Sequence, residues 1–314
     1  MITIADIEAA RRRIAPHIRR TPVMALDQTR DLAAGRARVS LKLECLQAAG
    51  SFKARGAMNR LLGMHGKPDK AGLVTASGGN HGLAVARTAH VAGIPAKVYL
   101  PRTVSPEKVE KLKEWKANIE IVGHVFEHAN AAALDYSGET GAVYVHPFAD
   151  PLVVAGQGTL GLDILDDIAD VDTILVAIGG GGLIAGISTA VKARNPKVRI
   201  IGVQATGAPS MKASLEAGHV VTLPEVTTKV ATLAAKRTDE RVFDLIRGKV
   251  DDVILVSDDE MKDAARWLWF ECGIAADLSG AASIAALRSG RIAERPGEHI
   301  CALICGAGSD GALV

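Results

Sequence analysis

The sequence predicts an α/β fold with mainly parallel sheets that carry helices on both faces. Short apolar runs alternate with amphipathic stretches along most of the 314 residues. Several of these runs are rich in β-branched residues and lack polar alternation, as expected for strands that are covered on both faces. Strand and helix candidates take turns along the chain, which is the order that places helices around parallel strands. A hydrophobic content of 48% is enough for more than one domain.

Nine apolar runs are strand candidates, and helix candidates lie between them. One helix is expected after Ser257, because Ser257 and Glu260 have the spacing of a capping box. Another is expected after Ser105, with Pro106 at its first position. The strand candidates are residues 39–45, 72–76, 96–100, 119–122, 143–145, 173–178, 198–203, 253–256 and 300–305.

Composition excludes several classes of function. The formal net charge is +2, from 37 basic and 35 acidic residues, and aromatic residues make up 4%, so no nucleic-acid partner is expected. No apolar run is long enough to span a bilayer, and residues 1–20 have no apolar signal core, so we expect a cytoplasmic protein without membrane contact. The four cysteines show neither C-x-x-C spacing nor a zinc pattern, as expected for thiols in a reducing cytosol.

The first motif that could carry chemistry is Gly-Ser-Phe-Lys-Ala-Arg-Gly at residues 50–56. It follows a strand candidate and opens a helix, with Ser51 as the expected N-cap and Lys53 in the first turn. Helix N-termini favour anions, so a lysine there needs a phosphate or aldehyde partner to be more than a solvated surface residue. A lysine amine forms Schiff bases, and desolvation lowers its pKa into the useful range. Lys53 is therefore a candidate catalytic residue.

The second motif is Ser-Gly-Gly-Asn-His-Gly at residues 77–82, directly after a strand candidate. Such a loop points backbone N–H groups and short polar side chains toward one spot at a helix N-terminus. This arrangement is a receptor for a carboxylate or a phosphate. The alternative is a tight turn with Asn80 as a helix cap.

Two further loops follow predicted strands. Residues 179–182 are four consecutive glycines before a helix that begins near Leu183, which is typical of a phosphate cradle. The run fits neither a Walker motif nor dinucleotide spacing, so a monophosphate is favoured over a bare turn. Cys305 stands at the carboxyl end of the last predicted strand, the edge where ligands bind in open α/β sheets. Its alternative is a buried structural thiol.

In this order, the four motifs resemble the fold-type II enzymes that depend on pyridoxal 5′-phosphate (PLP), specifically the serine/threonine dehydratase and serine racemase group. The resemblance covers nearly the whole chain, from Thr21-Pro22 to the Cys305 loop. It implies a two-domain, tryptophan synthase β-like fold around one PLP, and a homodimer. We expect residues 1–65 and 145–314 to form the large domain and residues 66–144 to form a small inserted domain.

The resemblance also implies a role for each motif. Lys53 would form the Schiff base with PLP and later move the Cα proton of the substrate. The glycine run would bind the phosphate through backbone amides, Asn80 would bond the pyridoxal hydroxyl, and Cys305 would face the pyridine nitrogen. The set that contacts the cofactor is Lys53, Phe52, Asn80, Gly179, Gly180, Gly181, Gly182, Leu183 and Cys305, and the set that receives the substrate carboxylate is Ser77, Gly79, Asn80 and His81.

The expected activity is elimination of water from serine, threonine or 3-hydroxyaspartate, which yields a 2-oxo acid and ammonia. A neutral thiol at the pyridine nitrogen makes PLP a weaker electron sink than a carboxylate would, and this suits β-elimination. The alternatives are a serine or aspartate racemase, a β-replacement synthase, and a PLP-binding protein without turnover. Racemases of the family place an acid/base serine where this chain has Gly78, and the synthases usually read Asn-Thr where it has Asn80-His81.

Two other stretches depart from the family pattern. Where relatives often carry Ala-Asp-Gly near the cofactor, residues 232–237 read Thr-Leu-Ala-Ala-Lys-Arg. A Lys236 or Arg237 that reaches the site would favour an acidic substrate such as 3-hydroxyaspartate, and a solvated pair is the alternative. Where some relatives bind a divalent cation, this chain has Gln204 and Ser210, so no metal site, or only a weak or monovalent one, is expected. We also expect no regulatory domain after the Cys305 loop.

Overall fold

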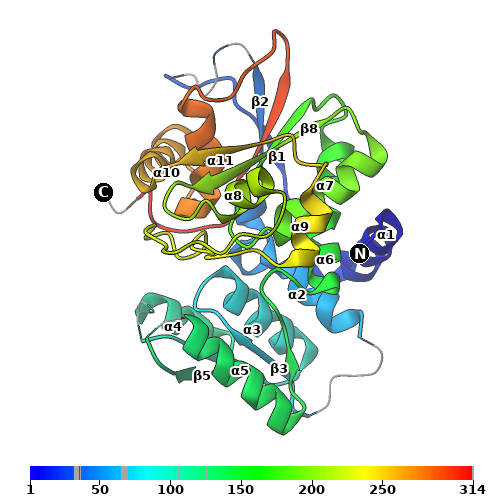
Figure 1. The fold of residues 1–314 in the computed structure, drawn as a ribbon, viewed down its shortest axis with the longest axis vertical. Coiled ribbons are helices and arrows are strands. Elements are labelled where there is room, and N and C mark those ends of the chain that lie inside the picture. The colour runs from blue at the N-terminus through cyan, green and yellow to red at the C-terminus, as the bar shows by residue number, and fades with distance from the viewer. Residues whose placement is uncertain are drawn as a thin grey trace.

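The strands of this protein form two sheets, each in its own lobe. The structure, a computed structural model, describes residues 1–31, 35, 37–64, 70–102, 104, 106–124 and 126–312. The large lobe is built on a six-stranded sheet of order β1-β2-β10-β7-β8-β9, and the small lobe is built on a four-stranded sheet of order β5-β4-β3-β6 (Figure 1). The predicted boundary at residues 65 and 66 lies outside the described residues, as does Ser105, and the domain limits stay a prediction.

The six-stranded sheet is parallel except at one edge. Its β10–β2, β10–β7, β7–β8 and β8–β9 pairs are parallel, and every residue of β7 is buried, as predicted for a strand covered on both faces. The sequence analysis missed β1, a three-residue strand that pairs antiparallel with β2. The strands are β1 Val23–Ala25, β2 Arg38–Lys42, β7 Thr173–Ile178, β8 Arg199–Ala205, β9 Asp252–Val256 and β10 His299–Leu303.

The four-stranded sheet is parallel in each of its pairs. All four of its strands lie within one or two residues of their predicted positions. Its apolar residues lie in small clusters separate from the main core that fills the large lobe, and one of these clusters also includes residues of α1 (Ile4–Ile14), α2 (Lys53–Leu62) and α6 (Pro151–Asp167). The strands are β3 Leu73–Ala76, β4 Ala96–Leu100, β5 Asn118–Ile121 and β6 Val143–Tyr144.

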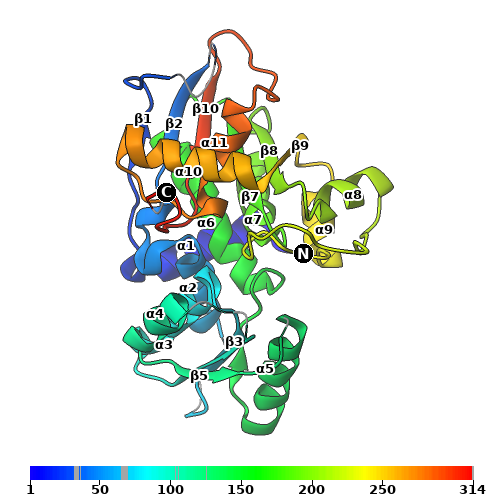
Figure 2. The same cartoon turned by 90° about the vertical axis from the view of Figure 1, so that its left-hand side faces the viewer.

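Helices cover both faces of the large sheet, with α10 and α11 on one side and α6 and α7 on the other (Figures 1 and 2). The predicted capping box of Ser257 and Glu260 is present at the start of α10. The α-helices are α1 Ile4–Ile14, α2 Lys53–Leu62, α3 Asn80–Ala92, α4 Pro106–Glu114, α5 Phe126–Thr140, α6 Pro151–Asp167, α7 Gly182–Arg194, α8 Ser210–Ala217, α9 Glu240–Ile246, α10 Asp258–Cys272 and α11 Leu278–Arg288. The predicted α/β class with mainly parallel sheets is confirmed.

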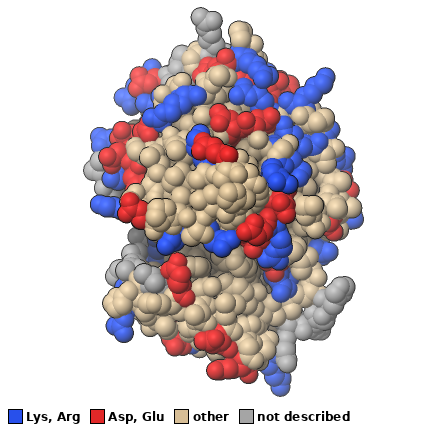
Figure 3. All heavy atoms as spheres, viewed as in Figure 1, with Lys and Arg blue, Asp and Glu red and all other residues tan. Residues whose placement is uncertain are grey.

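The face of the molecule seen in Figure 3 shows no block of one charge sign. Basic and acidic side chains are interspersed there, and the molecule is hollowed between its two lobes (Figure 3). Among the described residues, no helix has the length and apolarity needed to cross a membrane.

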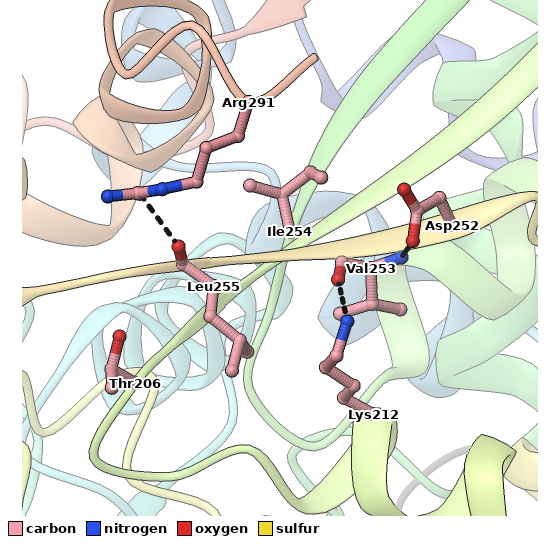
Figure 4. Close-up of a pocket in the computed structure, with 7 residues that line it drawn as sticks. All are labelled: Thr206, Lys212, Asp252, Val253, Ile254, Leu255 and Arg291. Atoms are coloured by element: carbon pink, nitrogen blue, oxygen red, sulfur yellow. Dashed lines mark hydrogen bonds between the residues drawn. The ribbon is translucent and has the colours of Figure 1, made fainter. Parts of the chain in front are cut away.

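The outer edge of β9 is closed by two cationic side chains. Lys212 Nζ donates to the carbonyl oxygen of Val253 at 2.9 Å, and Arg291 Nη1 donates to that of Leu255 at 3.0 Å (Figure 4). They line an open hollow of about 400 Å³ at this edge. Because edge carbonyls without partners invite pairing with another chain, we interpret this hollow as edge protection rather than as a reaction site.

A buried ion cluster joins α2 to the large lobe. The Arg55 guanidinium bonds both carboxylate oxygens of Glu44 at 2.8 Å and Asp163 Oδ2 at 2.8 Å, and the side chains of Arg55 and Glu44 are fully buried. Burial alone would raise the pKa of Glu44, but the charge and hydrogen bonds of Arg55, together with the Thr21 hydroxyl and the charge of Lys42, outweigh it and lower that pKa. Glu44 follows β2 and Asp163 lies on α6, so one side chain connects three elements.

Replacing Arg55 with methionine is expected to lower the free energy of unfolding by about 3–5 kcal/mol near pH 7, because the fully buried Glu44 loses its cation while Asp163 keeps Arg11. The loss should shrink as the pH is lowered, since without Arg55 the burial of Glu44 raises its pKa and favours its protonated form. Urea unfolding measures both effects. Arg38→Met is the control: Arg38 and its partner Asp170 are exposed, so the loss should stay below about 1 kcal/mol. Equal losses in the two variants would contradict the cluster's role.

Candidate active site

Lys53 is the first residue of α2, one position after the helix N-cap Phe52. The prediction that Ser51 caps this helix is wrong. Ser51 is extended because it bridges to Gly306 in the loop after β10, and its buried Oγ has no partner among the described residues. The helix starts one residue later, and no side chain caps it.

The Lys53 amine is held and desolvated. Its Nζ donates to the carbonyl oxygen of Pro147 at 2.6 Å, and burial lowers the pKa of Lys53 to about 8, against a small opposing effect of Cys305. The carbonyl is presented by a tight turn, in which His146 Nδ1 accepts the N–H groups of Phe148 at 3.2 Å and Ala149 at 2.9 Å. An amine with this pKa is neutral often enough at physiological pH to act as nucleophile and base.

The Cys305 loop lies directly beside the Lys53 segment. Phe52 N–H donates to the carbonyl oxygen of Cys305 at 3.2 Å, and the Cys305 thiol donates to the carbonyl oxygen of Ser279 at 3.5 Å. Burial raises the pKa of Cys305, so its thiol stays protonated. It lies two positions after Leu303, the last residue of β10, at the carboxyl edge where the sequence placed it.

The asparagine loop begins α3, with Gly79 as its N-cap and no side-chain cap. Asn80 Nδ2 donates to Asp277 Oδ2 at 2.6 Å, and Ser77 Oγ accepts Gly79 N–H at 3.3 Å. The His81 side chain is buried and its Nε2 bonds the carbonyl oxygen of Val145 at 2.9 Å. Burial lowers the pKa of His81 to about 3, so this ring is neutral. Contact of Ser77 and His81 with substrate stays a prediction.

The glycine loop leaves no room for side chains. A Cβ at Gly180 would lie 2.3 Å from the Phe148 ring, and one at Gly182 would lie 2.4 Å from the Phe148 carbonyl oxygen. Gly181 has a φ of +95°, which L side chains rarely adopt. The α7 helix that follows has Gly181 as its N-cap and no side-chain cap, and Thr238 Oγ1 fixes the loop by donating to Gly180 O at 2.9 Å.

The segment around Thr232 lies against two of the four sequence motifs. A Cβ at Gly79 would lie 3.4 Å from Thr232 Cγ2, and one at Gly179 would lie 2.6 Å from the Thr232 carbonyl oxygen. Thr232 therefore touches both the asparagine loop and the glycine loop. Together with the Asn80–Asp277 bond and the Cys305–Phe52 bond, this contact brings all four sequence motifs together between the lobes.

Three helix N-termini that meet at this place, those of α2, α3 and α7, lack side-chain caps. At the start of α2, the N–H groups of Ala54 and Arg55 bond the carbonyl oxygens of Ser51 and Phe52. The first N–H groups of α3 and α7 are therefore the ones available to an anion. The arrangement fits PLP and an amino acid, which bring one phosphate and one carboxylate to a desolvated amine. The helices α1, α6, α9, α10 and α11 are capped by Thr3, Asp150, Asp239, Ser257 and Asp277.

Comparison with known proteins identifies the class. The family model described as "Pyridoxal-phosphate dependent enzyme" matches residues 14–306, so the chain belongs to this family and its cofactor is PLP. It is 39% identical over 287 residues to an L-threonine ammonia-lyase of Thermotoga maritima, a match that covers 91% of this chain and 71% of that protein.

Solved structures place the chain more closely within the fold. Maize serine racemase superposes with a TM-score of 0.91 at 35% identity, covering 98% of this chain and 93% of that one. The crystal structure of a T.th. threonine deaminase superposes with a TM-score of 0.89 at 35% identity, covering 98% of both chains. The predicted two-domain fold-type II architecture is confirmed.

The structure describes both stretches that depart from the family pattern. Arg237 Nη2 bonds Glu240 Oε1 at 3.0 Å with both side chains about half exposed or more, and Lys236 is exposed, as the solvated alternative predicts. Gln204 Nε2 donates to Ser210 Oγ at 3.4 Å, and Gln204 Oε1 accepts Lys212 N–H at 3.1 Å. An amide that is already bonded on both sides offers little to a hard cation.

Sequence reasoning gave no role to several residues that shape the site. Phe148 and Thr238 pack against the glycine loop, as does Thr232 of the stretch expected near the cofactor, and Pro147 holds the Lys53 amine. Asp277 was also missed. Its place before an apolar stretch could have marked it as a helix N-cap, but nothing local in the sequence pairs it with Asn80.

PLP is expected to link to the cofactor-free protein at a rate that rises with pH around a midpoint near 8, because only the neutral Lys53 amine attacks the aldehyde. Stopped-flow absorbance in buffers from pH 6 to 10 records this rate. Free lysine blocked at its α-amino group serves as the reference amine. A midpoint at the ordinary lysine value of 10.5 would contradict the desolvation of Lys53.

Proposed function

We propose that the chain eliminates water from L-threonine and L-serine, giving ammonia and 2-oxobutanoate or pyruvate. The observation that carries this proposal is the Lys53 amine, desolvated to a pKa of about 8 at the point where three uncapped helix N-termini meet. The names of the sequence relatives support the choice of threonine, since the relative from Thermotoga maritima is an L-threonine ammonia-lyase.

Each part of the site has a task in this reaction. PLP supplies the electron sink for the electrons of the Cα–H bond. The neutral Lys53 amine takes the Cα proton, and the resulting ammonium delivers a proton toward the departing β-hydroxyl. The N–H groups at the start of α7 hold the phosphate, and those at the start of α3 receive the substrate carboxylate. The protonated Cys305 thiol leaves the pyridine nitrogen without a counter-charge.

Position 78 supplies no proton donor to the cofactor face opposite Lys53. Gly78 carries no side chain, and a Cβ there would lie 2.6 Å from Val104 Cγ2, so even serine would require Val104 to move. A racemase needs a proton donor on each face of the substrate carbon. The likeness to maize serine racemase keeps racemization as the second candidate, and Gly78 favours elimination over it.

An acidic substrate has less support. Within residues 232–237, Arg237 is paired with Glu240 at the surface and Lys236 is exposed. Neither cation is therefore placed to bind a second substrate carboxylate. Serine and threonine bring no such charge, so 3-hydroxyaspartate ranks below them.

We also propose that the enzyme is a homodimer in the cytoplasm that needs no divalent metal. The resemblance carries the homodimer, the composition and the lack of an apolar signal core in residues 1–20 carry the cytoplasmic location, and the bonded Gln204–Ser210 pair supports the third expectation. Light scattering should give twice the chain mass of 32.8 kDa. A mass of one chain would contradict the dimer, and loss of activity after dialysis against EDTA would contradict the absence of a metal.

The holoenzyme is expected to release ammonia and 2-oxo acid from L-threonine and L-serine in a panel that includes the D-isomers and 3-hydroxyaspartate. Lys53→Ala should lower the rate by more than about 10²-fold, because it removes the proton carrier, whereas Lys262→Ala, at an exposed lysine, should leave it unchanged. Chiral chromatography of the remaining substrate tests racemization. Inversion of serine that outpaces ammonia release would favour the racemase, and neither release nor inversion despite bound PLP would contradict both.

A further inference from the structure

The bond between Asn80 and Asp277 crosses from one lobe to the other. Asn80 starts α3, which packs on the four-stranded sheet, and Asp277 caps α11, which packs on the six-stranded sheet. The 2.6 Å bond joins residues that are 197 positions apart in the chain. It lies against Gly306, where a Cβ would come within 2.6 Å of Asp277 Oδ2 and 2.7 Å of Asn80 Nδ2.

The carboxylate of Asp277 is buried and fully engaged. Its Oδ1 accepts Ser279 Oγ–H at 2.7 Å and Gly280 N–H at 2.5 Å, and its Oδ2 accepts the Asn80 amide. Burial raises the pKa of Asp277, and these three donors oppose that rise and stabilise the charged form. The N–H group of Asp277 donates to the carbonyl oxygen of Gly306 at 3.0 Å, so the residue is anchored through its backbone as well as its side chain.

This carboxylate decides which way the Asn80 amide faces. Both carboxylate oxygens of Asp277 act as acceptors in these bonds, so the NH₂ group of Asn80, and not its oxygen, points at Asp277. The second N–H of that NH₂ group has no acceptor among the described residues. It diverges from the first, next to Gly306 and the Cys305 loop, and is the donor that a cofactor hydroxyl needs.

We propose that Asp277 is a positioning residue, which orients the Asn80 amide toward the PLP ring hydroxyl and thereby ties cofactor seating to the contact between the lobes. This inference rests on the proposed contact of Asn80 with that hydroxyl. Without Asp277 the amide is free to flip and to present its oxygen, which would repel the oxygen of the cofactor.

The test is a double-mutant cycle of Asn80→Ala and Asp277→Asn on PLP affinity and on the visible spectrum of the bound cofactor. Asparagine is as good an N-cap as aspartate, so the start of α11 is kept, but its NH₂ group would face that of Asn80. Asp277→Asn is expected to weaken PLP binding about tenfold or more and to shift the spectrum. Because Asp277 acts through Asn80, the double variant should bind PLP no more weakly than Asn80→Ala alone.

Two controls separate positioning from folding. Asp150 is the N-cap of α6 and pairs with Arg60. Asp150→Asn makes the same substitution there and should leave PLP affinity and spectrum unchanged. Thermal unfolding of each cofactor-free variant reports the structural effect alone. If Asp277→Asn lowers the melting temperature, Asp277→Ser, which also keeps a capping oxygen, enters the same cycle in its place.

Each outcome decides the inference. Non-additive losses of PLP affinity with a shifted spectrum support it. Additive losses, or wild-type affinity and spectrum in Asp277→Asn, overturn it while leaving the proposed contact of Asn80 intact. An Asn80→Ala variant with wild-type affinity and spectrum overturns that contact, and this inference with it, without touching the proposed elimination reaction, which the ammonia assay tests separately.

Discussion

The position of the Lys53 amine depends on a buried guanidinium two residues further along the same helix. Arg55 is bonded to Glu44 after β2 and to Asp163 on α6, so the first turn of α2 cannot shift without breaking a fully buried ion cluster. Buried ion pairs add little net stability, but breaking one is costly. The cluster therefore acts as a positional constraint. It fixes where the amine meets the Pro147 carbonyl oxygen, and the surrounding burial then sets the pKa of Lys53.

Around this fixed amine, the fold uses helix starts in place of charged side chains. The N-termini of α2, α3 and α7 have no side-chain caps, and the glycine loop before α7 has no space for a Cβ at Gly180 or Gly182. Backbone N–H groups hold an anion without a long side chain that must be ordered first. A site of this kind can hold a phosphate and a carboxylate side by side, as a cofactor–amino acid pair requires.

The sequence was most informative where local pattern decides structure. The β7 strand and the four glycines after it could be predicted because an apolar run and a loss of side chains are both local features. Ser51 shows the limit: it has the chemistry of an N-cap, but its pairing with Gly306 keeps it extended. Asp277 could not be assigned to the site either, since its bond to Asn80 depends on how the two lobes meet. Tertiary contacts override local preference at Ser51, and at Asp277 they add a partner to the locally expected cap.

The central claim is that Lys53, and no other lysine, carries PLP. Borohydride reduction of the holoenzyme fixes the cofactor to its lysine, and peptide mass spectrometry then locates the added mass. The structure predicts the modification on the peptide that contains Lys53, at near-complete occupancy, because burial lowers the pKa of this amine to about 8 and the uncapped helix starts surround it. Modification of another lysine, such as Lys42 or Lys212, with Lys53 left free would contradict the account.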